Sequence, residues 1–262
     1  MAHAAPDRAP DLAALAWQIE LGADEAIGET PVDRFERAEP AAVQASPTRA
    51  APVAAAAPAA VAPLEAGAAD LAAGCADLAA LRATLGRFEG SALRLGARNL
   101  VFSDGDPRSR LMVIGEAPGR DEDLAGLPFV GPSGQLLDRM LAAIGLSRKA
   151  ADPAFGAYIT NVLPWRPPQN RDPSGDEAAL LLPFLFRHIE LARPEVLLLL
   201  GSPAVRAVLA TTDGVTRMRG RWFDWRGVPV IATWHPAALL RDASKKRDAW
   251  ADLLQLKARL GG

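Results

Sequence analysis

Short apolar runs alternate with stretches of helical spacing from about residue 100 onward. The apolar runs predict strands at 111–114, 158–160, 196–200 and 228–233. The helical stretches predict helices at 133–144, 176–192, 203–209 and 246–260. Ser202 before Pro203 is expected to cap one helix, and Ser174 or Asp176 to open another. Strands that alternate with helices predict an α/β fold with a parallel sheet covered on both faces.

The first 69 residues differ in composition from the rest. Residues 1–37 form an N-terminal segment, in which apolar residues at helical spacing near its start predict a short helix. Residues 38–69 are nearly all Ala, Pro and other small residues, so they cannot bury enough apolar surface to offset ordering entropy and are expected to form a flexible linker. A Leu-rich helix is predicted over 69–87, and the folded domain over 70–262.

Charge is divided unevenly between the two parts. Residues 1–74 hold 11 acidic and 4 basic side chains, net −7, whereas residues 75–262 hold 20 acidic and 25 basic ones, net +5. A mildly basic folded part fits a polyanionic partner but is also typical of an ordinary solvated surface. The one cysteine, Cys75, excludes an intramolecular disulfide. Neither a secretory signal nor a membrane-spanning run is evident, so a cytoplasmic protein without a membrane partner is expected.

Three motifs follow predicted strands, so their polar side chains are expected to meet at one edge of the sheet. They are GEAPG at 115–119 leading into PFVG at 128–131, TN at 160–161 followed by RPPQNR at 166–171, and HPAALLR at 235–241. The first is either a plain strand-to-helix turn or a glycine turn that a ligand approaches closely. It matches no nucleotide-binding glycine pattern.

Each motif contains a residue suited to binding a flat polar ligand. Phe129 is either a stacking surface or a hydrophobic plug. Asn161 carries a donor and an acceptor, which pair with a base edge or with loop backbone. His235 follows a strand directly, where a hydrogen-bond donor would face the site. The Leu239 to Arg241 stretch is a wedge for a duplex or the first turn of an ordinary helix.

In this order and spacing, the motifs GEAPG, EDxxGxPFVGxxGxLL, TNxxxxRPPxNRxP and HPxxLLR resemble family four of the uracil-DNA glycosylase superfamily over about residues 88–262. The resemblance implies a three-layer α/β/α domain around a short parallel sheet. It implies a monofunctional DNA glycosylase that flips uracil out of DNA and hydrolyses its N-glycosidic bond, leaving an abasic site for base excision repair. The partner would be uracil-containing DNA, single- or double-stranded, and a monomer is expected.

One family feature is missing from the sequence. Family four holds an iron–sulfur cluster with four Cys, and motif spacing puts those positions at Phe88, Ser91, Trp165 and Leu181. None of these side chains ligates iron in the usual way. The resemblance therefore predicts a member without the cluster, in which packing replaces it and no cofactor or metal is needed.

The resemblance assigns roles in base recognition to four residues. Phe129 would stack on uracil, and Asn161 would pair with its O4 and N3 edge. His235 would stabilise the charge that develops on O2. Glu122 would lie close to C5 of uracil and sterically exclude the methyl group of thymine.

Further roles concern water and DNA. Ala117 stands where the best-known family of the superfamily has a catalytic Asp, so Asn170 and Glu116 are the candidates for positioning the attacking water. The residues expected to contact DNA lie on the second and third motifs, and they are Arg166, Arg171, Leu239, Leu240 and Arg241.

Two rival functions stay open. The chain is also consistent with a glycosylase for hypoxanthine or xanthine, because pocket width cannot be read from sequence. A second rival is a repair protein that binds uracil-DNA without catalysis. The joint presence of Phe129, Asn161 and His235 argues against this second rival.

Overall fold

A computed structural model describes residues 61–171 and 173–261, so the short helix predicted within 1–37 lies outside the described residues. The strands are β1 (Leu111–Gly115), β2 (Ala157–Asn161), β3 (Val196–Leu200), β4 (Trp222–Trp225) and β5 (Val228–Thr233). The α-helices are α2 (Val61–Ala73), α3 (Leu78–Arg87), α4 (Leu93–Gly96), α5 (Arg120–Ala125), α6 (Pro132–Ala143), α7 (Gly175–Ala192), α8 (Gly201–Leu209), α9 (Val215–Met218), α10 (Pro236–Arg241) and α11 (Lys246–Arg259). Short 3₁₀ turns are η2 (Pro153–Phe155), η3 (Pro168–Asn170) and η4 (Ala243–Lys245). Within these ranges no helix is both long and apolar enough to cross a lipid bilayer.

The sheet has the strand order β2-β1-β3-β5-β4. The first four strands are parallel, and β4 pairs antiparallel with β5 at the edge. The chain passes from β1 to β2 on one side and from β3 to β5 on the other, so the order reverses between β1 and β3. Ligands of such sheets bind beyond the carboxyl ends of the strands at the reversal. Gly115 and Asn161 end β1 and β2 there, directly opposite each other.

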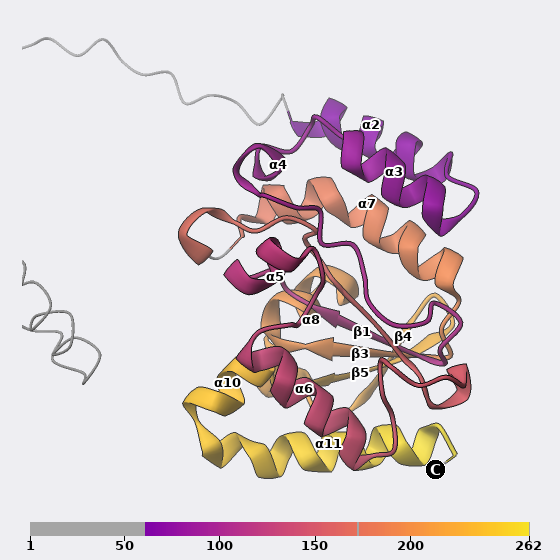
Figure 1. Cartoon of the computed structure of the whole chain (residues 1–262), viewed down its shortest axis with the longest axis vertical. Coiled ribbons are helices and arrows are strands. Elements are labelled where there is room, and N and C mark those ends of the chain that lie inside the picture. The colour runs from indigo at the N-terminus through magenta and orange to yellow at the C-terminus, as the bar shows by residue number, and fades with distance from the viewer. Residues whose placement is uncertain (1–60, 172, 262) are drawn as a thin grey trace, which may run out of the picture. The chain divides into compact units, whose positions relative to one another are not determined.

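The sheet lies between two helical layers (Figure 1). Along β1, Met112 and Ile114 point into the core shared with α7 and α8, whereas Leu111 and Val113 point into the core shared with α6 and α11. This alternation is the two-residue period of a strand, and burial on both faces explains why the strands are apolar throughout. The predicted three-layer α/β/α fold is confirmed.

The N-terminal boundary differs from the prediction. Helix α2 begins at Val61, so residues 61–69 of the predicted linker are helical, whereas its residues 38–60 lie outside the described residues. Ala is the strongest helix former, and α2 buries Ala68 and Ala72 in the core that α7 also joins. The single helix predicted over 69–87 is instead two, because the chain breaks after α2 and Asp77 caps α3 by accepting from the Ala80 N–H at 2.7 Å.

Two local features of the second half were also missed. A two-residue turn, Arg226 and Gly227, has φ angles of 49° and 86° and joins the unpredicted strand β4 to β5. Helix α8 begins at Gly201, so Ser202 is not its N-cap. The Ser202 hydroxyl oxygen instead accepts from the Val215 N–H at 3.0 Å and so anchors the start of α9.

A buried histidine of α7, His188, packs against Tyr158 of β2. His188 is 3% exposed, and its ring stacks on Phe102 with centroids 4.3 Å apart. The Tyr158 hydroxyl donates to Ser103 Oγ, so it accepts from His188 Nε2, which lies 2.8 Å away. Burial lowers the pKa of His188 to about 3, and the ring is therefore neutral in the folded protein.

This histidine predicts acid-sensitive stability. The unfolded pKa is about 6.5, so between that value and the folded pKa of about 3 the unfolded chain binds the extra proton. The free energy of unfolding should fall as pH drops through this window, by up to about 1.4 kcal/mol per pH unit. His188→Gln keeps a donor for Tyr158 but does not titrate. The free energy of unfolding, measured with urea between pH 7 and 4.5, should therefore fall less steeply with pH in this variant than in wild type. An unchanged slope would contradict this account.

Candidate functional site

The carboxyl ends of β1, β2 and β5 open into a cavity of about 420 Å³. Residues that the sequence had singled out form half of its lining, namely Ala117, Glu122, Phe129, Asn161, Asn170, His235 and Arg241. Of the others, Gly119, Gly131 and Ala237 also belong to the motifs, and the remaining four, Arg120, Asp121, Pro132 and Ser133, lie within two residues of them. Three motifs far apart in the sequence thus build one site.

Phe129 forms one wall of this cavity. It is 5% exposed, and its ring lies against that of His235 with centroids 5.5 Å apart. A Cβ at Gly115 would collide with both the Phe129 ring and the Asn161 amide, and a Cβ at Gly134 would collide with the Phe129 carbonyl. Glycine at these two positions therefore lets the aromatic wall close against the strand ends.

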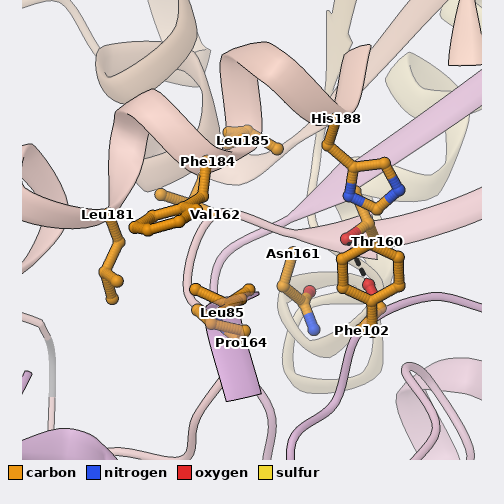
Figure 2. Close-up of a pocket in the computed structure, with 10 residues that line it drawn as sticks. All are labelled: Leu85, Phe102, Thr160, Asn161, Val162, Pro164, Leu181, Phe184, Leu185 and His188. Atoms are coloured by element: carbon orange, nitrogen blue, oxygen red, sulfur yellow. Dashed lines mark hydrogen bonds between the residues drawn. The ribbon is translucent and has the colours of Figure 1, made fainter. Parts of the chain in front are cut away.

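Asn161 has a hydrogen-bond acceptor without a partner. It is 5% exposed, and its Oδ1 is buried without a hydrogen-bond partner. This oxygen lies close to Gly115, near the space that the Phe129 ring also approaches, and Asn161 is among the residues that line the cavity. Asn161 also borders a second, small gap of about 20 Å³ next to α7, which Figure 2 shows, and there the Thr160 hydroxyl donates to the Phe102 carbonyl. An unpaired buried acceptor costs about 1–3 kcal/mol, so a ligand N–H in the cavity would relieve it.

His235 is a neutral donor in this site. Its Nδ1 accepts from the Ala237 N–H at 3.1 Å, which puts the proton of the neutral ring on Nε2. Burial, together with a smaller effect of the nearby Arg241 charge, lowers the pKa of His235 to about 4, while the Glu122 carboxylate opposes the shift. The ring is therefore uncharged near neutral pH and keeps one N–H for a ligand.

Glu122 joins the two loops that frame the cavity. Its Oε2 accepts from the Gly119 N–H at 3.1 Å, and its Oε1 accepts from the Val130 and Gly131 N–H groups at 3.0 Å. Three backbone donors thus hold the carboxylate. These contacts favour a loop-holding role over the predicted one of crowding the ligand.

The loop after β2 carries Asn170 to the cavity. Gln169 and Asn170 both adopt positive φ, and Arg166 Nε donates to Asn170 Oδ1 at 2.7 Å. Arg171 lies outside the cavity lining, and its guanidinium binds the Glu177 carboxylate at 2.6 and 2.8 Å. Arg166 therefore orients Asn170, while Arg171 fastens the loop to the first turn of α7.

Two other predicted residues lie elsewhere. Glu116 lines a neighbouring cavity of about 460 Å³ beside the start of α7. Leu239 is 2% exposed and packs in the core, because that face of α10 points inward, so this structure does not present it for the predicted contact with DNA. Leu240 is 48% exposed and is the residue free to act as a wedge.

The four positions where the family would hold iron are filled by packing. Phe88, Trp165 and Leu181 join the core, and Ser91 is 3% exposed. Phe88 packs on Phe184 with ring centroids 5.1 Å apart. None of the four side chains is a thiolate, so the donor set does not fit an iron–sulfur cluster. Within residues 61–171 and 173–261, no three His, Cys, Asp or Glu side chains gather to hold a metal ion.

Comparison with known proteins agrees with this geometry. A model of the uracil DNA glycosylase superfamily matches residues 102–254, which include the whole cavity lining. A type-4 uracil-DNA glycosylase of Archaeoglobus fulgidus is 43% identical over 150 residues, covering 54% of this chain and 72% of the relative. One of Thermotoga maritima is 38% identical over 159 residues, covering 59% and 78%. One of Saccharolobus solfataricus is 36% identical over 172 residues, covering 62% and 77%.

The state of His235 is directly measurable. Nitrogen-15 NMR should find the Nε2-protonated tautomer with a pKa of about 4. Arg241→Gln should raise that pKa, because it removes a nearby positive charge, whereas Arg247→Gln on the exposed side of α11 should leave it unchanged. A pKa near 6.5, or a proton on Nδ1, would contradict the assignment.

Proposed function

The chain belongs to the uracil-DNA glycosylase superfamily, and we propose that it hydrolyses the N-glycosidic bond of deoxyuridine in DNA. The observation that carries the proposal is Asn161, which lines the cavity walled by Phe129 and has a buried Oδ1 without a hydrogen-bond partner. An amide there accepts from uracil N3–H and donates to O4. Cytosine reverses this pattern, with an acceptor at N3 and a donor at N4.

Entry of the base requires that the nucleotide leave the helix. An enzyme that acts on a base in a duplex must extrude it into the pocket. Leu240, 48% exposed at the end of α10, is suited to fill the vacated stack. Arg120 and Arg241 line the cavity and are exposed, so their charges are available to the flanking phosphates. A single-stranded substrate would need the phosphate contacts but not the wedge.

Catalysis follows from the neutral His235. The C1′–N1 bond breaks with its electron pair on uracil, so negative charge grows on uracil O2 while the sugar becomes cationic. Nε2–H of His235 donates to O2, and its partner Ala237 N–H holds the ring in that tautomer. A pre-oriented donor in a buried site stabilises the developing charge without reorganisation.

Water then adds to the cationic C1′ and loses a proton, which neutralises the uracil anion through solvent, so that an abasic site and neutral uracil are formed. Asn170 lines the cavity and Glu116 lines the neighbouring one, which supports Asn170 as the residue that positions this water. Ala117 contributes no carboxylate. No Lys occurs among the described residues of the lining, so none is at hand to form an imine with the sugar, which supports a monofunctional enzyme.

We also propose that the activity needs no iron–sulfur cluster. Phe88, Trp165 and Leu181 are buried where cluster ligands would stand, and they join the loop after β2 to α3 and α7. Cys75 Sγ donates to the Leu71 carbonyl at 3.2 Å and contacts Thr84, apart from those positions. The monomeric state and the cytoplasmic location stay predictions.

The test compares wild type with two cavity variants and one control variant on a single-stranded oligonucleotide that contains one deoxyuridine. Chelator-treated, iron-free wild type should release uracil, and His235→Ala should lower kcat by on the order of 10² to 10³. Asn161→Ala should lower kcat/KM for lack of its base contact. His188→Gln, a buried histidine outside the cavity, is the matched control and should keep full activity. Intact substrate with wild type, or unchanged turnover in His235→Ala, would sink the proposal.

The proposed wedge role of Leu240 predicts a difference between duplex and single-stranded substrates. Leu240→Ala should slow excision from a duplex by about tenfold, since unstacking a base step costs a few kcal/mol, and should spare single strands. Leu254→Ala on α11 is the matched control, because Leu254 is 45% exposed against 48% for Leu240. Equal losses on duplex and single strand would show that Leu240 has another role.

A further inference from the structure

A buried arginine holds the backbone of the aromatic wall from outside the cavity. The Arg148 side chain is 5% exposed. Its Nη1 donates to the Pro128 carbonyl at 2.8 Å, and its Nη2 donates to the Phe129 carbonyl at 3.0 Å. One planar group therefore bridges two consecutive peptide carbonyls at the residue that walls the site.

Two carboxylates fix this guanidinium in turn. Nε donates to Asp138 Oδ1 of α6 at 2.8 Å, and Nη1 pairs with Asp104 Oδ2 at 3.1 Å. Asp104 is itself bound to β2, since its N–H and carbonyl both pair with Ile159. A buried charge is tolerated when it is paired and hydrogen-bonded in this way. Arg148 thus connects the loop before α6 to two rigid elements of the fold.

The loop needs such support because of its backbone. Phe129 has φ of 55°, a left-handed conformation that bulky residues adopt only where their surroundings hold them. Glu122 binds the N–H groups of Val130 and Gly131 just after it, and Gly134 leaves room for its carbonyl. Arg148 supplies the hydrogen bond to the carbonyl of Phe129 itself.

We propose that Arg148 is a positioning residue for base recognition, which keeps Phe129 in the conformation that places its ring beside His235 and over Gly115. The inference rests on the proposed function. Arg148 does not line the cavity, so it acts through Phe129. Lys keeps the positive charge near Asp104 and Asp138, but its ammonium cannot span two carbonyls as the flat guanidinium does.

The test is a double-mutant cycle of Arg148→Lys and Phe129→Ala on the single-stranded substrate. With Phe129 present, Arg148→Lys should lower kcat/KM by about 10- to 100-fold, because small misplacements of binding groups cost that much. With Phe129→Ala, the same change should cost less than about twofold, since coupled residues are not additive. Arg110→Lys is the control, because Arg110 also binds a carboxylate, Glu195, and a carbonyl, Leu260, away from the cavity.

Equal losses in both backgrounds, or no loss with Phe129 present, would overturn the proposal. Should Arg148→Lys not fold, Asp138→Asn loosens the same guanidinium from its more exposed side and should show a smaller loss with the same dependence on Phe129. Wild type that releases no uracil would refute the proposed function alone. The NMR chemical shifts of the His235 ring protons, which are sensitive to the Phe129 ring current, would then test the positioning role. Arg148→Lys must move these shifts towards their values in Phe129→Ala.

Discussion

The site depends on the absence of a side chain at Gly115. Where β1 and β2 end side by side, the Asn161 amide and the Phe129 ring both occupy the space that a Cβ would take. The amide oxygen is buried there, and the Phe129 ring lies close to it. A recognition edge and a stacking surface thus meet at one point of the sheet, and the remaining parts of the cavity are arranged around that contact.

Burial then sets the chemistry of the cavity. His235 stays neutral because charging a buried ring is unfavourable. The hydrogen bond from the Ala237 N–H to Nδ1 leaves the proton of the neutral ring on Nε2. The same low polarity makes the empty acceptor of Asn161 costly until a ligand fills it. A neutral donor and an unfilled acceptor complement a base that is neutral when bound and gains charge as it leaves.

The sequence predicted the layered fold and the meeting of the motifs, because strands buried on both faces are apolar and parallel strands end at one edge. It could not distinguish Leu239 from Leu240, since only the packing of α10 decides which one faces inward. Helix α2 was read as linker over 61–69, because its burial depends on α7. Arg148 belongs to no motif, and its role depends on contacts with residues distant in the sequence.

Asn161 alone does not choose between uracil and hypoxanthine, because hypoxanthine also presents an N–H beside a carbonyl oxygen. The most direct measurement is therefore mass spectrometry of the free bases released by chelator-treated, iron-free wild type from oligonucleotides containing deoxyuridine, deoxyinosine, deoxycytidine or thymidine. We predict free uracil and an alkali-labile abasic site from the first, with little or no release from the others. Intact deoxyuridine substrate, or faster release of hypoxanthine, would contradict a uracil-reading, cluster-independent site.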